Sequence, residues 1–169
     1  MTLHVVRHGR TEANASGLLL GRANPELDEI GRRQAEQIAA ALPSVARVVS
    51  SPLLRTSQTA DAIDPDHETD ERLLELDYGA FDLTPVKDVP AEVWAAWRSD
   101  ADFAPPGGES HRALARRISS VMSDLASDAL DGDVIVVTHV SPIKATLAWA
   151  LGVGIEVSWR SFVAQASIT

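Results

Sequence analysis

The chain has 169 residues, of which 45% are hydrophobic and 23% charged, and these values are typical of one globular domain. Its formal net charge of −9 argues against nucleic acid or an anionic membrane as the main partner. The absence of cysteine excludes disulfides and thiolate metal sites, and neither a signal peptide nor an apolar run of about 20 residues is present. We therefore expect a cytoplasmic protein whose residues 1–169 form a single domain, acting as a monomer or homodimer.

The first third of the chain predicts two strands and two helices in alternation. Leu3–Arg7 is typical of a short buried strand, and a helix follows from Gly31. In that helix apolar residues recur at helical spacing before Pro43 ends it, namely Ala35, Ile38, Ala39 and Leu42. A second strand is predicted at Val45–Ser50 and a second helix at Pro52–Ile63.

The middle of the chain is less regular. Residues 64–108 are rich in Pro, Asp and Gly, which indicates a lid-like excursion with one short helix at about 90–98. The pattern then predicts a long helix at 114–129, a fully buried strand at Val134–Thr138, a helix at Ser141–Leu151 and a last strand at Phe162–Ile168. Strands that alternate with helices predict a three-layer α/β/α fold around a mostly parallel sheet.

Polar residues follow three of the predicted strands, at Arg7-His8-Gly9, Ser50-Ser51-Pro52 and Thr138-His139. Because the carboxyl ends of parallel strands meet at one edge of a sheet, we expect these segments to converge. Arginine binds phosphate oxygens through its planar fork, and a neutral imidazole can attack phosphorus. The pair Arg7-His8 therefore predicts a phosphoryl-transfer site with His8 as nucleophile.

Two serine–proline pairs precede predicted helices in the same way. Ser51-Pro52 and Ser141-Pro142 each place a serine at the expected N-cap and a proline at the first helical position. Free N–H groups at such helix starts attract anions. Arg55 lies one turn into the first helix, and His139 ends the most apolar strand, so both are expected beside His8.

Over residues 3–167 the sequence resembles the histidine phosphatase superfamily, whose members have the phosphoglycerate-mutase-like fold. The resemblance rests on motifs that follow the order of the family: Arg7-His8-Gly9 with Thr11 and Asn14, Gly21-Arg22 with Leu27 and Gly31, the run Ser50–Ala60, Glu75 with Gly79, Pro106–Ser110, and Thr138-His139. The branch that it resembles most is that of broad acid phosphatases and α-ribazole phosphatases. The segment His139–Lys144 is also similar to a phosphatase domain that some bacteria fuse to a ribonuclease H.

The resemblance implies a role for each matching residue. His8 corresponds to the nucleophile that becomes phosphohistidine, and Glu75 to the proton donor for the leaving oxygen. The expected substrate-binding residues are Arg7, Thr11, Asn14, Gly21, Arg22, Arg55, His139 and Val140, of which Arg7, Arg55 and His139 also stabilise transition-state charge. The cations should lower the pKa of His8. No metal or cofactor is expected.

The sequence departs from the family pattern at four positions. Arg10 replaces a common Glu or Gln, which adds a cation near the site, and Val140 replaces a Gly. Phe81 replaces a Trp and Leu83 a Gly, so the turn after Glu75 is not assured. The reserve candidates for the acid are Asp77, Asp82 and Glu109.

Other conspicuous residues receive structural interpretations. Trp94 and Trp97 either line a substrate pocket or hold the lid helix in place, and Trp159 is interpreted as packing. Lys144 is expected on a solvated helix face. His111 is expected to lie outside the pocket entrance rather than to line it.

The favoured hypothesis is a metal-independent phosphomonoesterase acting on a small phosphorylated metabolite. The alternatives are a mutase that returns the phosphoryl group to a second hydroxyl, and a catalytically silent phosphate-binding module. A mutase has to shield phosphohistidine from water, usually with longer insertions than this chain has. The intact set of His8, Arg55, Glu75 and His139 argues against a silent module.

Overall fold

A computed structural model describes residues 2–43 and 47–169. Its central sheet contains β1 (Leu3–Arg7), β2 (Arg47–Ser50), β3 (Glu68–Thr69) and β4 (Val134–Thr138) in the order β1-β4-β2-β3, and every pair is parallel. All five residues of β4 are buried because this strand has neighbours on both edges and helices over both faces. Of the predicted second strand, Val45 and Ala46 lie outside the described residues.

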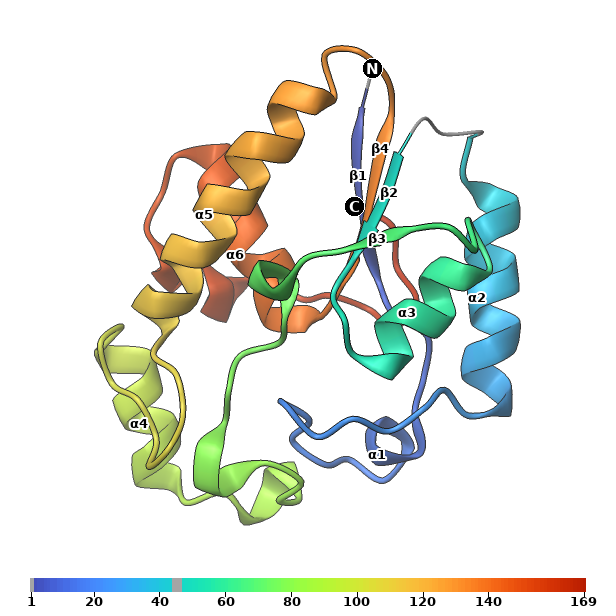
Figure 1. The fold of residues 1–169 in the computed structure, drawn as a ribbon. Coiled ribbons are helices and arrows are strands. Elements are labelled where there is room, and N and C mark those ends of the chain that lie inside the picture. Colours follow the sequence, from blue (N-terminus) through green and yellow to red (C-terminus); the bar gives the residue numbers. More distant parts are fainter. Residues whose placement is uncertain (1, 44–46) are drawn as a thin grey trace.

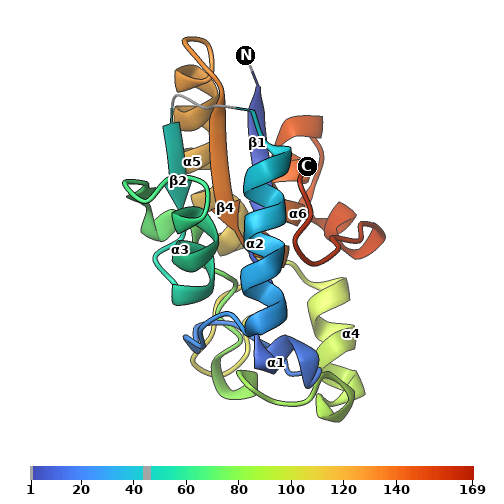
Figure 2. The same cartoon turned by 90° about the vertical axis from the view of Figure 1, so that its right-hand side faces the viewer.

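Helices cover both faces of the sheet, which confirms the predicted three-layer fold (Figures 1 and 2). One face packs on α2 (Glu29–Ala41) and α3 (Leu54–Asp61), and the other on α5 (His111–Asp128) and α6 (Val140–Leu151). Alternate strand residues supply the two cores, since successive side chains of a strand point to opposite faces. Val6, Val48, Ile135 and Val137 join the first core, and Val5, Val49, Val134 and Val136 the second.

Both serine–proline predictions placed the helix start wrongly. α3 begins at Leu54 behind an extended Leu53, so Ser51 lies before the helix, and its carbonyl accepts a hydrogen bond from Thr56 Oγ1 (2.8 Å). α6 begins at Val140 because the extended His139 already occupies the N-cap position. Pro142 is then the third helical residue. Proline is tolerated there because a backbone N–H at this position would have no intrahelical partner.

The predicted strand at Phe162–Ile168 is also wrong. Only the last residues run antiparallel to β1, through Arg7 N–H to Ser167 O (2.9 Å) and Thr169 N–H to Val5 O (2.8 Å), with one isolated bridge at Ile168. Ala166 has a φ of 51°, which bends the chain and keeps this pairing short.

Residues 64–108 divide into two parts. β3 extends the sheet and the 3₁₀ turn Glu71–Leu73 follows it, whereas residues 77–108 lie beyond the carboxyl ends of the strands (Figure 1). This second part contains the 3₁₀ turns Gly79–Phe81 and Val86–Asp88 and the helix α4 (Ala91–Ser99). A third core surrounds Trp97, which is 1% exposed, and it includes Leu19 and Val89. The short α1 (Glu12–Ala15) lies at the same end of the molecule.

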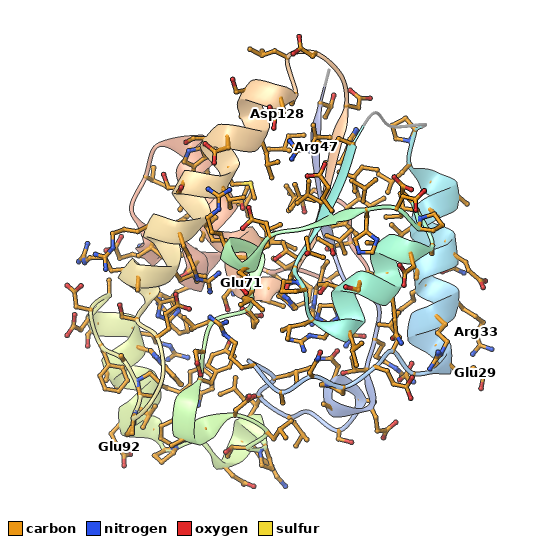
Figure 3. All side chains as sticks on the ribbon, viewed as in Figure 1. Glu29, Arg33, Arg47, Glu71, Glu92 and Asp128 are labelled. Atoms are coloured by element: carbon orange, nitrogen blue, oxygen red, sulfur yellow. The ribbon has the colours of Figure 1, made fainter. Side chains whose placement is uncertain are left out.

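Charged side chains form ion pairs near the surface, as Figure 3 illustrates. Arg33 and Glu29 are one turn apart on α2 at 2.9 Å, and Arg47 of β2 pairs with Glu68 (2.9 Å) and with Asp128 of α5. Exposed pairs of this kind each stabilise a protein by less than about 1 kcal/mol, so the fold depends mainly on its cores. None of the helices in the described ranges has the length and apolarity that crossing a bilayer requires.

Candidate active site

His8 lies directly after β1 and is 4% exposed. Its Nδ1 is 2.7 Å from the carbonyl oxygen of Gly9. A carbonyl only accepts hydrogen bonds, so in the neutral ring Nδ1 carries the proton and Nε2 keeps its lone pair. The ring is thus fixed in the tautomer in which Nε2 is the nucleophilic atom.

Burial is the largest cause that lowers the pKa of His8 well below its usual value, and the guanidinium groups of Arg55 and Arg7 lower it further. The sequence predicted the direction of this shift but attributed it to the cations alone. Desolvation adds to the charge effect because the ring is almost entirely removed from water. His8 is therefore neutral at pH 7.

His139 lies at the end of β4, with its ring centroid 5.2 Å from that of His8 in an edge-to-face arrangement. Arg55 donates from Nε to Nδ1 of His139 (3.2 Å), so the imidazole proton is on Nε2. That Nε2 is 2.9 Å from Oγ of Ser51, to which it donates. Burial and the Arg55 charge lower the pKa of His139 well below its usual value.

Arg55 is fully buried although it is charged. Its guanidinium also donates to the carbonyl oxygens of Ala23 (2.7 Å) and Gly21 (2.8 Å), which fixes the plane of the fork. Burial lowers the pKa of Arg55 to about 10, and Glu75 opposes this shift. The group therefore stays protonated at neutral pH.

Arg7, the last residue of β1, approaches the same space from the other side. Its Nη1 donates to the carbonyl of Val163 (2.8 Å), while its buried Nε has no hydrogen-bond partner among the described residues. Burial lowers the pKa of Arg7, and the Glu75 carboxylate partly offsets this. A buried guanidinium N–H without an acceptor is a ready donor for an incoming oxyanion.

Glu75 is 4% exposed and lies against the first turn of α6. Its Oε1 accepts from the backbone N–H groups of Leu76 (2.7 Å) and Ser141 (3.2 Å). The Glu75 carboxylate acts on both nearby arginines, since it opposes the lowering of the pKa of Arg7 and of Arg55. The structure thus brings together His8, Arg7, Arg55, His139 and Glu75 at the carboxyl edge of the sheet.

The other predicted substrate-binding residues have the following contacts. Thr11 and Asn14 form a capping box at the start of α1, in which Asn14 Oδ1 accepts from the Thr11 backbone N–H (3.2 Å) and hydroxyl (3.0 Å). Arg22 has a buried Nε without a partner in the described part of the chain, and its Nη2 is 3.6 Å from Glu109. Gly21 contributes the carbonyl that holds Arg55, and Val140 is the first residue of α6.

Arg10 does not add a cation to the site, because its Nε pairs with Asp28 at 2.7 Å. The reserve acids all have structural partners. Asp77 accepts from Gly79 N–H (2.8 Å), Glu109 pairs with Arg117 (2.7 Å), and Asp82 accepts from the N–H groups of Gly21 and Ala23 (both 2.7 Å).

The turn that was not assured is formed nevertheless. Leu83 adopts a φ of 61°, the left-handed conformation that glycine adopts without strain. Its N–H donates to Leu19 O (2.7 Å), and Leu19 N–H donates to Thr84 O (2.8 Å). The turn is thereby fastened to the segment whose carbonyls hold Arg55.

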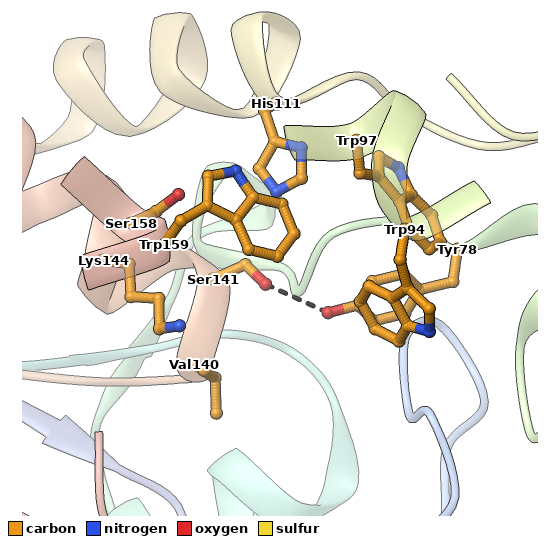
Figure 4. A pocket seen from close by; sticks show the side chains of 9 residues that line it. All are labelled: Tyr78, Trp94, Trp97, His111, Val140, Ser141, Lys144, Ser158 and Trp159. Atoms are coloured by element: carbon orange, nitrogen blue, oxygen red, sulfur yellow. Dashed lines mark hydrogen bonds between the residues drawn. The ribbon is translucent and has the colours of Figure 1, made fainter. Parts of the chain in front are cut away.

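A cavity of about 170 Å³ adjoins this centre (Figure 4). Its lining comes from α4, α5, α6, the 3₁₀ segment Ile155–Arg160 and the residue before the 3₁₀ turn Gly79–Phe81. The residues are Tyr78, Trp94, Trp97, His111, Val140, Ser141, Lys144, Ser158 and Trp159. The interpretation of Trp159 and Lys144 as packing and solvated residues is therefore incomplete, since both face this cavity. No sequence pattern placed these two residues at one cavity, because they come from separate segments. In the described ranges no three His, Asp or Glu side chains are arranged to hold a metal ion.

Comparisons with known proteins show the family to which this chain belongs. The family model described as "Histidine phosphatase superfamily (branch 1)" matches residues 3–169. The chain is 35% identical to the "Bifunctional protein Rv2228c" of Mycobacterium tuberculosis over 99% of its own length, but it spans only 49% of that relative. It is 28% identical to the adenosylcobalamin/alpha-ribazole phosphatase of Escherichia coli, over 98% of this chain and 86% of the relative.

The fold is also similar to solved structures. The structure of the mycobacterial glucosyl-3-phosphoglycerate phosphatase Rv2419c superposes with a TM-score of 0.85 at 29% identity, and the match covers 98% of this chain and 87% of the other.

Proposed function

Because this chain belongs to the histidine phosphatase superfamily, we propose that it is a phosphomonoesterase that hydrolyses a small phosphorylated metabolite through a phosphohistidine on His8. One observation carries the proposal. The His8 ring is buried, neutral and fixed by Gly9 O in the tautomer that leaves Nε2 unprotonated, beside two guanidinium groups. A nucleophile with this orientation and an anion-binding surround is what attack on a phosphoryl group requires.

In the first step Nε2 of His8 attacks phosphorus, the N–P bond forms and the P–O bond to the leaving alcohol breaks. Glu75 in its acid form gives its proton to the leaving oxygen. Arg7 and Arg55 hold the non-bridging oxygens, and Nε2–H of His139 exchanges Ser51 Oγ for a phosphoryl oxygen as its acceptor.

In the second step a water molecule attacks the phosphoryl group. The Glu75 carboxylate takes a proton from this water, the N–P bond breaks, and inorganic phosphate leaves. His8 returns to its neutral form with the proton still on Nδ1, because Gly9 O holds it there. None of these steps requires a metal ion or a cofactor.

Replacement of His8 by Ala tests the proposal. The wild type, mixed with an aryl phosphate labelled with ³²P, should release a burst of the phenol and carry label that is labile in acid and stable in base. His8→Ala should retain less than about one thousandth of the turnover and no label, because removal of a nucleophile abolishes its covalent route. His67→Ala, which changes a histidine of the turn after α3, is the matched control and should behave as wild type.

The same experiment separates the alternatives. Base-labile label on serine, or label that persists in His8→Ala, would refute the mechanism. A mutase would be indicated if water removed the labelled phosphoryl group only slowly while a second alcohol accepted it. Phosphate binding without label or turnover would indicate a silent module.

The proposal also assigns the protein to the cytoplasm, as a monomer or homodimer that acts on a small substrate. The absence of cysteine is consistent with a reducing compartment, and the net charge of −9 disfavours nucleic acid as substrate.

A further inference from the structure

The cavity in Figure 4 lies beside the candidate active site. It shares Ser141 with the catalytic centre, because the backbone N–H of Ser141 donates to Glu75 while its hydroxyl is 3.1 Å from that of Tyr78. In the proposed function Glu75 protonates the leaving oxygen, so the group attached to that oxygen enters this cavity. The inference therefore rests on the proposed function.

The walls of the cavity are aromatic. Three of the four tryptophans of the chain line it, together with Tyr78. The Trp94 ring centroid lies 5.3 Å from that of Trp97 and 6.4 Å from that of Trp159, and the rings of Trp94 and Trp159 are perpendicular. His111 adds a further ring at 5.3 Å from Trp159. Such walls favour a flat ring, which can stack on one face and meet the edge of another.

The size of the cavity limits this ring to a small one. An apolar cavity of about 150 Å³ holds one benzene molecule, and the cavity here has about 170 Å³. The walls cannot simply move apart, since Trp97 is 1% exposed and anchors the core under α4. A single six-membered ring with one small substituent fits this space.

Lys144 supplies the cation of this cavity. It follows Val140 and Ser141 by one helical turn, so all three lie on the same face of α6, and Figure 4 shows its ammonium on their side of the cavity. The half-buried ammonium has no hydrogen bond or ion pair with any other described residue. Burial lowers its pKa, and the Glu75 carboxylate opposes this shift. An acidic substituent on the ligand would give Lys144 its partner.

We propose that the natural substrate is a phosphate ester whose alcohol carries one flat six-membered ring with an acidic substituent, the ring lying among Trp94, Trp97 and Trp159 and the acid on Lys144. Phosphate and acid then bind to separate cations, Arg7 and Arg55 on one side and Lys144 on the other. A ligand of this class engages the catalytic centre and the cavity at the same time.

Three esters with alkyl leaving groups test this proposal: ethyl, benzyl and 4-carboxybenzyl phosphate. We expect the kcat/KM of the wild type to increase from ethyl to benzyl to 4-carboxybenzyl phosphate. Lys144→Met should lower the ratio of 4-carboxybenzyl to benzyl phosphate about tenfold, mainly through KM, because it removes one charged contact that is made in the ground state as well. Lys87→Met changes the only other lysine, which is exposed in a 3₁₀ turn, and should leave that ratio unchanged.

A second variant tests the ring. Trp94→Ala should lower the ratio of benzyl to ethyl phosphate about tenfold, whereas Phe162→Ala, which removes an aromatic ring that is 89% exposed, should not alter it. Circular dichroism and Tm verify that each variant is folded. The inference would be refuted if Lys144→Met left the 4-carboxybenzyl to benzyl ratio unchanged and Trp94→Ala left the benzyl to ethyl ratio unchanged. The proposed function would still stand in that case, provided that turnover depends on His8. No turnover of any of the three esters, or of an aryl phosphate, would refute the proposed function itself.

Discussion

The two buried histidines of the centre carry their protons on opposite ring nitrogens. Gly9 O holds the proton of His8 on Nδ1, whereas the Arg55 N–H bound to Nδ1 of His139 places the proton of that ring on Nε2. The Nε2 of His8 thus keeps a lone pair, whereas the Nε2 of His139 is a donor, bonded to Ser51 Oγ. In the proposed mechanism the first forms a bond to phosphorus and the second binds one of its oxygens.

The proposed role of Glu75 leads to a prediction about leaving groups. Glu75→Gln should slow the hydrolysis of ethyl phosphate by about 10²–10⁴-fold, because an alkoxide is a poor leaving group without a proton. An aryl phosphate with an acidic phenol should slow less than about tenfold. The kcat/KM of a series of esters, which reports the phosphorylation of His8 and not the later attack by water, measures the difference as a change in slope against the pKa of the leaving alcohol.

Asp77→Asn is the matched control for this prediction, since Asp77 is two residues away and accepts from Gly79 N–H. It should leave the slope as in the wild type. An equal loss for alkyl and aryl esters in Glu75→Gln would contradict the role of proton donor.

At this scale the sequence predicted residues that the fold brings together in the candidate site, but of the cavity beside it only Val140 and, in one of two interpretations, Trp94 and Trp97. Arg7, His8 and His139 follow strand ends, so the parallel sheet alone brings them together. Trp159 and Lys144 could not be predicted, because their meeting depends on how α4 and the segment after α6 fold over the carboxyl edge. The contact of Ser51 with His139 was missed because the serine was assigned to a helix cap instead.

At the scale of elements, the strained backbone of Leu83 belongs to a turn that helps to position Arg55. Asp82 accepts from the N–H groups of Gly21 and Ala23, whose carbonyl oxygens in turn hold Arg55. The left-handed Leu83 directly follows Asp82 and fastens this turn to Leu19. The predicted helices and strands were mostly correct because apolar periodicity encodes them. The predicted starts of α3 and α6 were wrong because the extended residues Leu53 and His139 determine where these helices begin.

Replacing the strained residue should therefore stabilise the protein. Leu83→Gly should raise the free energy of unfolding by about 0.5 kcal/mol, because the left-handed conformation costs a non-glycine residue about 1–2 kcal/mol and added chain freedom offsets part of that gain. Urea unfolding measures the change. Leu130→Gly, at a 71% exposed position outside the left-handed region, is the control and should be destabilising. Equal destabilisation by both substitutions would show that Leu83 is not strained.

At the scale of the whole molecule, stability should depend on pH through the buried histidines. Burial lowers the pKa of both His8 and His139, while in the unfolded chain each titrates near its usual value of about 6.5. Below about pH 6.5 the unfolded chain therefore binds more protons than the folded one, and stability falls as the pH falls. The loss should reach about 1.4 kcal/mol per pH unit for each histidine.

Urea unfolding of the wild type and His8→Asn between pH 7 and 5 measures this dependence. The variant should lose less stability per pH unit, whereas Phe162→Ala, which changes no titratable group, should match the wild type. Carboxylates act in a separate window, since the hydrogen bond from Arg47 lowers the pKa of Glu68 and its contribution is lost only in more acidic solution. Identical slopes for the wild type and His8→Asn would mean that His8 is not held neutral by the fold.

The contact between Gly9 and Gly31 has an evolutionary consequence. A Cβ at Gly9 would lie 2.4 Å from Gly31 O, and one at Gly31 would lie 2.0 Å from Arg10 O, so the backbone of α2 touches the loop that carries His8. No single substitution at either position avoids a backbone collision, and relief requires the whole helix to shift. Neutral substitutions should therefore not accumulate at these two sites. Related sequences that differ in the residues of the aromatic cavity should still retain both glycines.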